Sequence, residues 1–208
     1  MPQPEISVLL VEDHSLVRRG FRRMLEDDPS IRVVGEASDG HEAVEAAANL
    51  HPRVVVMDFA LPSMNGALAT RHMVKANPDI AILVLSMHSE PTYVRTCLDA
   101  GARGYLLKNA MDLELVDAVK KIANGERVLD PRLTLPPDDE AIPPLSTREL
   151  EVLQLIVHGK SNKDIAMVLG LSANTVNVHR SNIMQTLGIH NTADLVVYAI
   201  RNGLVSIT

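Results

Sequence analysis

The chain has 208 residues, of which 46% are hydrophobic and 22% are charged, and its formal net charge is −6. This composition is typical of soluble globular proteins and excludes a disordered or fibrous chain, and the length predicts one large or two modest domains. The single cysteine, Cys97, excludes an intrachain disulfide and a cysteine-based zinc site. With neither a secretory leader nor an apolar run of membrane-spanning length, we expect a cytoplasmic protein that does not enter a membrane.

The charge is unevenly divided along the chain. Residues 1–125 carry a net charge of −4, residues 126–142 carry −3 and residues 143–208 carry +1. A polyanion is repelled by the acidic parts. Any nucleic-acid binding is therefore expected in the last third of the chain.

The first 125 residues alternate short apolar runs with longer amphipathic stretches, a pattern typical of repeated βα units. Val, Ile and Leu dominate the apolar runs, as expected for a parallel sheet covered by helices on both faces. We expect five strands, at residues 6–11, 32–37, 54–58, 80–86 and 104–107. The helices are expected at residues 14–26, 40–50, 66–76, 91–100 and 112–124. The predicted fold of residues 1–125 is a flavodoxin-like α/β domain with a five-stranded parallel sheet.

A change of composition marks a domain boundary. Residues 126–144 contain five prolines and an acidic run at residues 138–140. Proline removes backbone donors and like charges repel, so this segment is expected to be a semi-extended linker.

From residue 145 the hydrophobic period becomes helical. Ser146, Ser161 and Ser172 are typical N-caps, and a glycine follows the expected end of each helix. Four short helices are expected, ending near residues 158, 169, 187 and 202. Residues 145–208 are therefore predicted to form an all-α domain whose second and third helices make a helix-turn-helix.

Polar side chains stand at the carboxyl ends of four expected strands, where parallel open sheets bind their ligands. Glu12 and Asp13 follow the first strand and Asp58 ends the third. Ser86 ends the fourth strand, and Lys108 follows the fifth. Converging carboxylates favour a hard divalent cation, above all Mg²⁺. The same residues suit phosphoryl transfer, with Asp58 as the nucleophile and with Lys108 and Ser86 holding phosphoryl oxygens.

Four segments are similar to the receiver domain of two-component response regulators. They are VLLVEDH at residues 8–14, VVMDFALPSMNG at 55–66, LS at 85–86 and GYLLK at 104–108. The resemblance covers about residues 5–125. It implies that Asp58 accepts a phosphoryl group from a sensor histidine kinase. It also implies that the domain catalyses its own phosphorylation and dephosphorylation without being a turnover enzyme.

The same resemblance implies roles for the neighbouring residues. Asp13 is expected to bind Mg²⁺ directly, Glu12 to act mainly through a metal-bound water, and Asp58 and the carbonyl of Ala60 to complete the site. Ser86 and Tyr105 are expected to form a switch pair that turns toward the phosphoryl group. The sequence departs from the family pattern at Glu12, where aspartate is commoner, and at Asn109, where a proline often follows the lysine.

Three further segments resemble the LuxR-type DNA-binding domain: LSTRELEVL at residues 145–153, GKSNKDIA at 159–166 and LSANTVNVH at 171–179. The resemblance implies that residues 172–187 are the recognition helix, which enters the major groove. Its expected outward face, which reads base edges, consists of Asn174, Asn177, Val178 and Ser181. The expected phosphate contacts are Lys160, Asn162, Lys163, Ser172, Thr175, His179 and Arg180. Together the two resemblances indicate a transcription regulator of the NarL/FixJ type.

The DNA-binding segment carries few basic residues, and Asn177 stands where a lysine is usual. A single copy is expected to bind promoter DNA weakly, so a homodimer on paired half-sites is expected after activation. The apolar stripe on the last helix serves either a dimer contact or the core of its own domain. This stripe consists of Leu195, Val196, Ala199 and Ile200.

Other classes of function remain open at this point. A flavodoxin-like enzyme or nucleotide binder has the same kind of sheet, but the sequence lacks the glycine-rich nucleotide-binding patterns and the nucleophile elbow. A regulator that works without phosphorylation, with a degenerate pocket, is a second alternative. A receiver that serves mainly as a protein-docking module is a third.

Overall fold

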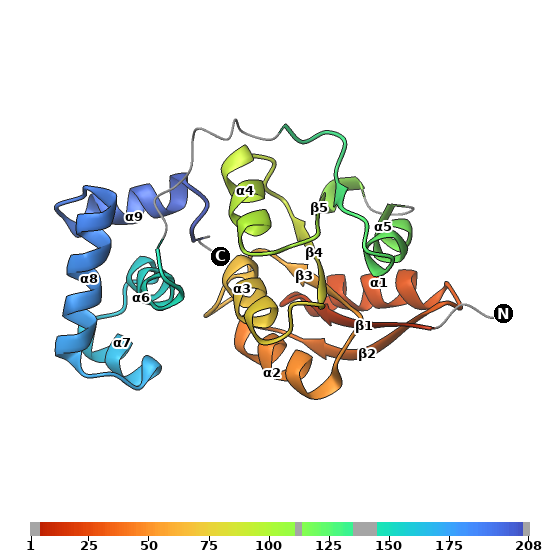
Figure 1. Ribbon diagram of the computed structural model, residues 1–208, viewed down its shortest axis with the longest axis horizontal. Coiled ribbons are helices and arrows are strands. Elements are labelled where there is room, and N and C mark those ends of the chain that lie inside the picture. Colours follow the sequence, from red (N-terminus) through yellow and green to blue (C-terminus); the bar gives the residue numbers. More distant parts are fainter. Residues whose placement is uncertain (1–4, 111–113, 135–144, 206–208) are drawn as a thin grey trace. The chain divides into compact units, whose positions relative to one another are not determined.

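The computed structural model describes residues 5–110, 114–134 and 145–205. The chain divides into two compact units, Met1–Leu135 and Pro136–Ile207. The first alternates strands and helices, and the second is helical (Figure 1). The start of the fifth expected helix, at residues 112–113, and residues 135–144 of the expected linker lie outside the described residues.

The first unit contains a parallel sheet with strand order β2-β1-β3-β4-β5-β6. The strands are β1 (Ile6–Val11), β2 (Ile31–Ala37), β3 (Val54–Asp58), β4 (Ala81–Ser86), β5 (Gly104–Leu107) and β6 (Val128–Leu129). The predicted parallel α/β class is confirmed, with one strand more than the five expected. The extra strand, β6, comes from the segment predicted to be linker. Its two residues pair with Gly104 and Tyr105 of β5, and so short a pairing leaves no periodic signal in the sequence.

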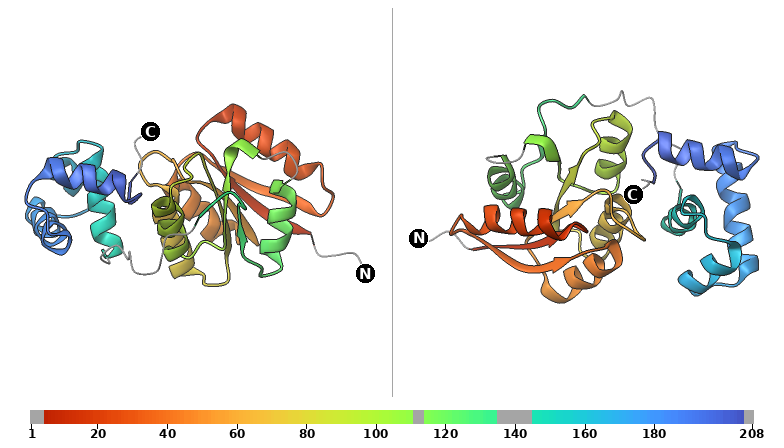
Figure 2. Two further views of the ribbon diagram at one scale, coloured as in Figure 1. Left: turned by 90° about the horizontal axis from the view of Figure 1, so that it is seen from above. Right: turned by 180° about the vertical axis from the view of Figure 1, so that it is seen from behind.

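Helices cover both faces of this sheet (Figures 1 and 2). The helices are α1 (Ser15–Glu26), α2 (Gly40–Leu50), α3 (Gly66–Ala76), α4 (Pro91–Asp99) and α5 (Glu114–Ala123), and a 3-10 turn, η1, spans Lys108–Ala110. Helices α1 and α5 pack on one face, where Phe21 and Ile122 join Leu10 and Leu83 in one apolar core. Helices α2, α3 and α4 lie on the other face. Because successive strand side chains point to opposite faces, both cores draw on the same strands.

The strand order decides where a site forms. On one side of β1 lies β2. On its other side lies β3, followed by β4 and β5, so the strand order reverses between β1 and β3. Crossover helices leave on opposite faces at this point, which opens a crevice at the carboxyl ends of β1 and β3. Glu12 and Asp58 stand at those two ends. No helix in the described ranges is long and apolar enough to cross a membrane.

The second unit contains α6 (Thr147–Val157), α7 (Asn162–Leu169), α8 (Ala173–Leu187) and α9 (Thr192–Arg201), as the predicted four-helix domain requires. Ser146 and Ser161 each form a capping box, and the Ser172 hydroxyl accepts a hydrogen bond from the Thr175 amide at 3.0 Å. Each cap satisfies backbone donors at a helix start, so the serine positions set where the helices begin. The core joins all four helices through Leu153, Ile165, Val176, Ile183 and Leu195.

Candidate functional site

Two buried carboxylates share one ammonium group at the carboxyl end of the sheet. The Lys108 Nζ lies 2.7 Å from Glu12 Oε2 and 2.7 Å from Asp58 Oδ2. Glu12 is 1% exposed and Asp58 is 3% exposed. Three elements that are distant in sequence thus place their charges within direct contact: β1, β3 and the η1 turn after β5. Such a buried cluster of charge is costly unless each charge is paired.

Burial raises the pKa of Asp58 to about 6, although the Lys108 ammonium opposes this shift. Burial lowers the pKa of Lys108, but the carboxylates of Asp58 and Glu12 outweigh it and the net shift is upward. At neutral pH Asp58 is therefore mainly ionised and Lys108 is protonated. An ionised carboxylate at the mouth of a crevice, facing a fixed cation, is suited to nucleophilic attack on an anionic group.

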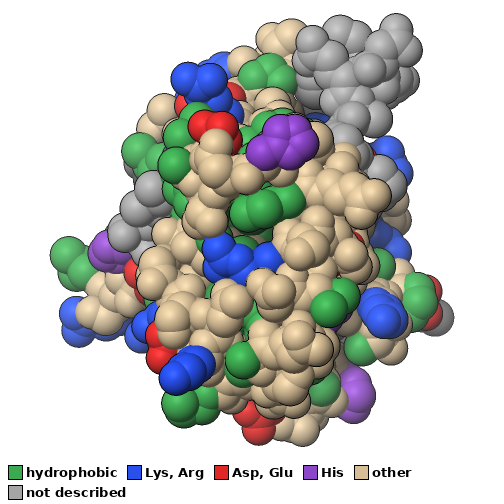
Figure 3. Space-filling model, turned by 90° about the vertical axis from the view of Figure 1, so that its left-hand side faces the viewer, with side chains coloured by type: hydrophobic (Ala, Val, Ile, Leu, Met, Phe, Trp, Pro, Cys, Tyr) green, Lys and Arg blue, Asp and Glu red, His purple; other side chains and the backbone are tan. Residues whose placement is uncertain are grey.

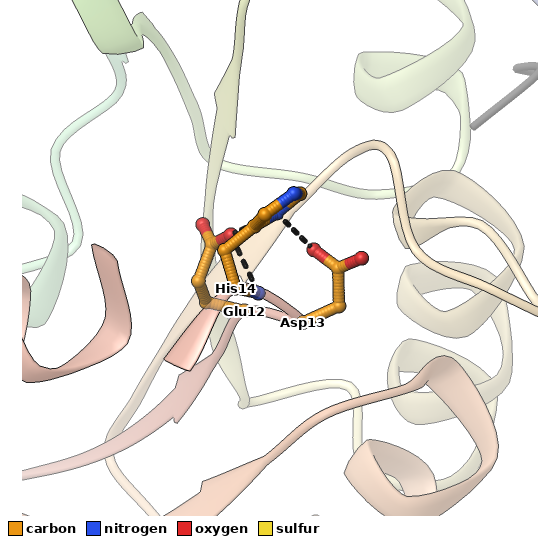
Figure 4. A group of neighbouring side chains, drawn as sticks. All are labelled: Glu12, Asp13 and His14. Carbon is orange, nitrogen blue, oxygen red and sulfur yellow. Dashed lines mark hydrogen bonds and ion pairs between the residues drawn. The ribbon is translucent and has the colours of Figure 1, made fainter. Parts of the chain in front are cut away.

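Asp13 follows Glu12 in the chain and lies in a group with Glu12 and His14 (Figure 4). Oxygen and nitrogen atoms of these three side chains lie within 4.8 Å of one another. The His14 ring lies between the two carboxylates, with its Nδ1 2.7 Å from Asp13 Oδ1 and 3.2 Å from Glu12 Oε1. Asp13 raises the pKa of His14, with a smaller contribution from Glu12. No role was predicted for His14 from the sequence.

The donor set fits a hard divalent cation. Asp13 Oδ1 is buried and, apart from its ion pair with His14, has no hydrogen-bond donor at suitable angles. The other available atoms are carboxylate oxygens of Glu12 and Asp58, and oxygen donors of this kind are the ones Mg²⁺ prefers. The amide of Ala60 donates a hydrogen bond of 3.2 Å to Asp58 Oδ1, so the loop after β3 turns back over the site.

The expected switch pair meets at one backbone position, His88. The His88 amide donates to the Ser86 hydroxyl at 3.0 Å, and the Tyr105 hydroxyl donates to the His88 carbonyl at 2.8 Å. Tyr105 is fully buried, so its ring points inward. The His88 ring stacks on Tyr93 at 4.2 Å, and Phe59 packs edge-on against both rings. No role was predicted for Phe59, His88 or Tyr93 from the sequence.

Gly66, the first residue of α3, leaves no room for a side chain beside the Asp58 backbone. A Cβ atom at this position would lie 2.2 Å from the Asp58 carbonyl oxygen. We expect Gly66→Ala to destabilise the fold by about 1–3 kcal/mol, because the β3 end must move to make room. Thermal unfolding measures this loss of stability. Gly20→Ala is the matched control: a Cβ atom there meets nothing within 4 Å, and alanine is the better helix former. Equal unfolding temperatures for both variants would contradict the crowding at Gly66.

Helix α8 presents the expected base-reading residues to solvent. Asn174, Asn177, Val178 and Ser181 are all exposed, whereas Val176 and Ile183 are fully buried. The Ser181 hydroxyl is tied to the Asn177 carbonyl of its own helix at 3.1 Å. Val178 is 51% exposed.

The residues expected to contact phosphate differ in their exposure and in the hydrogen bonds that their side chains already make. Lys160 and Lys163 are exposed, and Asn162 is half-buried at the start of α7. The side chains of Ser172 and Thr175 bond each other at 2.8 Å, and Arg180 donates to the Thr192 hydroxyl at 2.9 Å. His179 is half-buried, and its Nδ1 atom is buried without a hydrogen-bond partner.

Lys and Arg side chains are sparse in the second unit. On the face drawn in Figure 3, Lys and Arg side chains stand in separate groups among hydrophobic and uncharged ones. The apolar stripe of α9 serves the core at three of its four positions, because Leu195 and Ala199 are fully buried in the core and Val196 packs against it. Val196 and Ile200 are half-buried.

Comparison with known protein families agrees with this arrangement. Residues 8–120 match the response regulator receiver domain, and residues 143–199 match the bacterial regulatory proteins of the luxR family. The chain therefore belongs to the two-component response regulators that join a receiver domain to a LuxR-type DNA-binding domain. Proteins of this family are DNA-binding regulators and not turnover enzymes, as the sequence predicted.

Individual relatives match along nearly the whole chain. The transcriptional regulatory protein DegU of Brevibacillus brevis is 36% identical over 98% of this chain and 96% of its own length. The response regulator UvrY of Escherichia coli K12 is 38% identical over 96% of this chain and 95% of its own length. Among solved structures, RcsB of Salmonella enterica serovar Typhimurium, bound to the promoter rprA in the presence of the phosphomimetic BeF3−, aligns with a TM-score of 0.60. Its sequence is 25% identical, and the match covers 93% of this chain and 98% of RcsB.

Proposed function

We propose that a partner histidine kinase phosphorylates this response regulator on Asp58 in a Mg²⁺-dependent reaction, and that the phosphorylated protein binds promoter DNA as a dimer. The contact of Lys108 with both Glu12 and Asp58 carries the proposal, because it unites a nucleophile, a cation and a metal-binding carboxylate in one crevice. We further propose residues 1–125 as the receiver, residues 126–144 as the linker and residues 145–208 as the DNA-binding domain. The proposed location is the cytoplasm, where promoter DNA lies.

In the proposed reaction, an Asp58 oxygen attacks the phosphorus of a phosphohistidine. The P–N bond breaks, its electron pair leaves with the imidazole nitrogen, and an acyl phosphate forms on Asp58. Lys108, already 2.7 Å from that carboxylate, pairs with one phosphoryl oxygen. Glu12, Asp13, Asp58 and the Ala60 carbonyl would hold Mg²⁺, which offsets the negative charge of the incoming group.

The proposed switch starts at Ser86. A phosphoryl oxygen competes for the Ser86 hydroxyl, which at present accepts the His88 amide. Because the Tyr105 hydroxyl bonds the carbonyl of the same residue, movement at His88 reaches Tyr105 and the start of α4. Two arrangements of this loop would give the bistable element that a phosphorylation switch needs.

Retention of DNA tests this function. The full chain is incubated with Mg²⁺ and acetyl phosphate, and fragments of genomic DNA that it retains are selected. We expect phosphorylated protein to enrich a small set of fragments with paired half-sites, and untreated protein to retain DNA weakly. The same enrichment without phosphodonor favours the alternative of a phosphorylation-independent regulator. No enrichment in either state favours the alternative of a protein-docking module.

We propose that α8 is the recognition helix, and its central exposed residue gives a sharp test. Asn177→Ala is expected to reduce the preference for a selected site over unrelated DNA by about ten-fold, because a side-chain contact to a base edge is worth about 1–3 kcal/mol. Asn182, exposed on a different side of α8, provides the control Asn182→Ala. Binding titrations on both DNAs at one salt concentration measure the effect. An unaltered preference for Asn177→Ala would remove this residue from base reading.

A further inference from the structure

We infer that Asp130 and Arg132 are positioning residues for Lys108: they hold the backbone amide before this lysine and the side chain after it, and so aim its ammonium at Asp58. The inference rests on the proposed phosphorylation of Asp58. It concerns the segment after α5, which the sequence analysis assigned to the linker and to which it gave no part in the pocket.

Asp130 holds the residue before Lys108. Its side chain is almost completely buried at the end of β6, and its carboxylate Oδ2 accepts the Leu107 amide at 3.2 Å. Its own amide donates to the Tyr105 carbonyl at 2.9 Å, so both backbone and side chain bind β5. The carboxylate thus takes a strand-like hydrogen bond one residue beyond the end of the β5–β6 pairing.

Arg132 holds the residue after Lys108. Its Nε donates to Asp130 Oδ1 at 2.7 Å, its amide donates to the same oxygen at 3.0 Å, and its Nη2 pairs with Asp130 Oδ2. Its remaining guanidinium nitrogen, Nη1, donates to Asn109 Oδ1 at 3.1 Å. One planar guanidinium therefore links a buried carboxylate to the side chain that follows Lys108, a geometry that the point charge of a lysine does not reproduce.

Because the residues before and after it are held, Lys108 extends its side chain into the pocket from a fixed backbone position. Its side chain is 14% exposed, and its Nζ contacts Glu12 and Asp58 at the same distance of 2.7 Å. The Arg132 hydrogen bond holds the pKa of Asp130 at about 2, so the anchoring carboxylate stays ionised at any working pH. Because a small misplacement of a catalytic group lowers the rate of a reaction far more than it weakens binding, an anchor of this kind acts on the rate constant.

The test separates positioning from simple stabilisation of β6. Asn109→Ala removes the contact after Lys108 but leaves the Asp130–Arg132 pair intact, and Arg132→Ala removes both. Arg127→Ala is the matched control, because Arg127 is an exposed arginine of the same segment. Asn109→Asp retains an oxygen acceptor for Arg132 and serves as the conservative rescue.

Three quantities are measured on the full chain: the rate constant for phosphorylation by acetyl phosphate at saturating Mg²⁺, the rate of reductive methylation of Lys108, located by peptide mass spectrometry, and the unfolding temperature. We expect Asn109→Ala and Arg132→Ala to phosphorylate about ten-fold more slowly. Lys108 should also be methylated faster in both. Arg127→Ala and Asn109→Asp should behave as wild type.

Wild-type rates and wild-type Lys108 reactivity in both alanine variants, in a protein that is itself phosphorylated, overturn the positioning role and leave the proposed function standing. Slower phosphorylation together with a lower unfolding temperature and unchanged Lys108 reactivity shows a merely structural role and also overturns it. A wild-type protein that takes up no phosphoryl group overturns the proposed function, and the inference fails with it.

Discussion

Asp58→Asn is expected to lower phosphoryl uptake from acetyl phosphate by at least about 100-fold, since an amide oxygen does not form a stable acyl phosphate. The variant should fold at least as well as wild type. Burial raises the pKa of Asp58 to about 6, so its ionised form is held at a cost, and a neutral amide of the same shape avoids that cost. Intact-protein mass spectrometry after incubation with Mg²⁺ measures uptake, and thermal unfolding measures the fold.

Asp27→Asn is the matched control for this experiment. Asp27 is an exposed aspartate beside the end of α1, and its loss should leave phosphoryl uptake unchanged. If Asp58→Asn is phosphorylated as readily as wild type, Asp58 is not the phosphoacceptor. Uptake lost equally in both variants would instead point to a general effect of removing negative charge from this acidic unit.

Lys108→Met is expected to change two measured quantities in opposite directions. Phosphorylation should slow by about 10- to 100-fold, because the cation that pairs with a phosphoryl oxygen is gone. The affinity for Mg²⁺ should rise by about three- to ten-fold, because the ammonium now 2.7 Å from both Glu12 and Asp58 no longer competes for their charge. Calorimetric titration with Mg²⁺ and phosphorylation kinetics on the same preparation measure the two effects.

The opposite signs are what make this variant informative. A merely unfolded or distorted pocket loses both phosphorylation and Mg²⁺ affinity. Lys121→Met removes an exposed lysine of α5 and should change neither quantity, which controls for net charge. Weaker Mg²⁺ binding by Lys108→Met, at an unchanged unfolding temperature, would show that the lysine supports the metal site and does not compete with it.

Much of the architecture was predictable from local patterns. Val, Ile and Leu runs bounded by turn residues placed β1, β3 and β5 at their observed bounds, and Ser146 and Ser161 marked the starts of helices through capping. The pocket residues were also accessible, because in a parallel sheet a residue at the end of a strand is at the carboxyl edge wherever that strand lies. To apply this rule, only the last residue of each strand must be known.

The sequence by itself therefore determined the α/β class, the helical C-terminal unit and the gathering of Glu12, Asp58, Ser86 and Lys108 at one edge, since each follows from short-range periodicity and chain direction. Only the tertiary structure decided which of these groups touch. Lys108 meets Glu12 across 96 positions of sequence, and Asp130 reaches Leu107 across 23. Such contacts depend on side-chain lengths and on which strands become neighbours, so they leave no periodic trace. This second group also includes the two-residue β6 and the hydrogen bonds that join Asp130, Arg132 and Asn109.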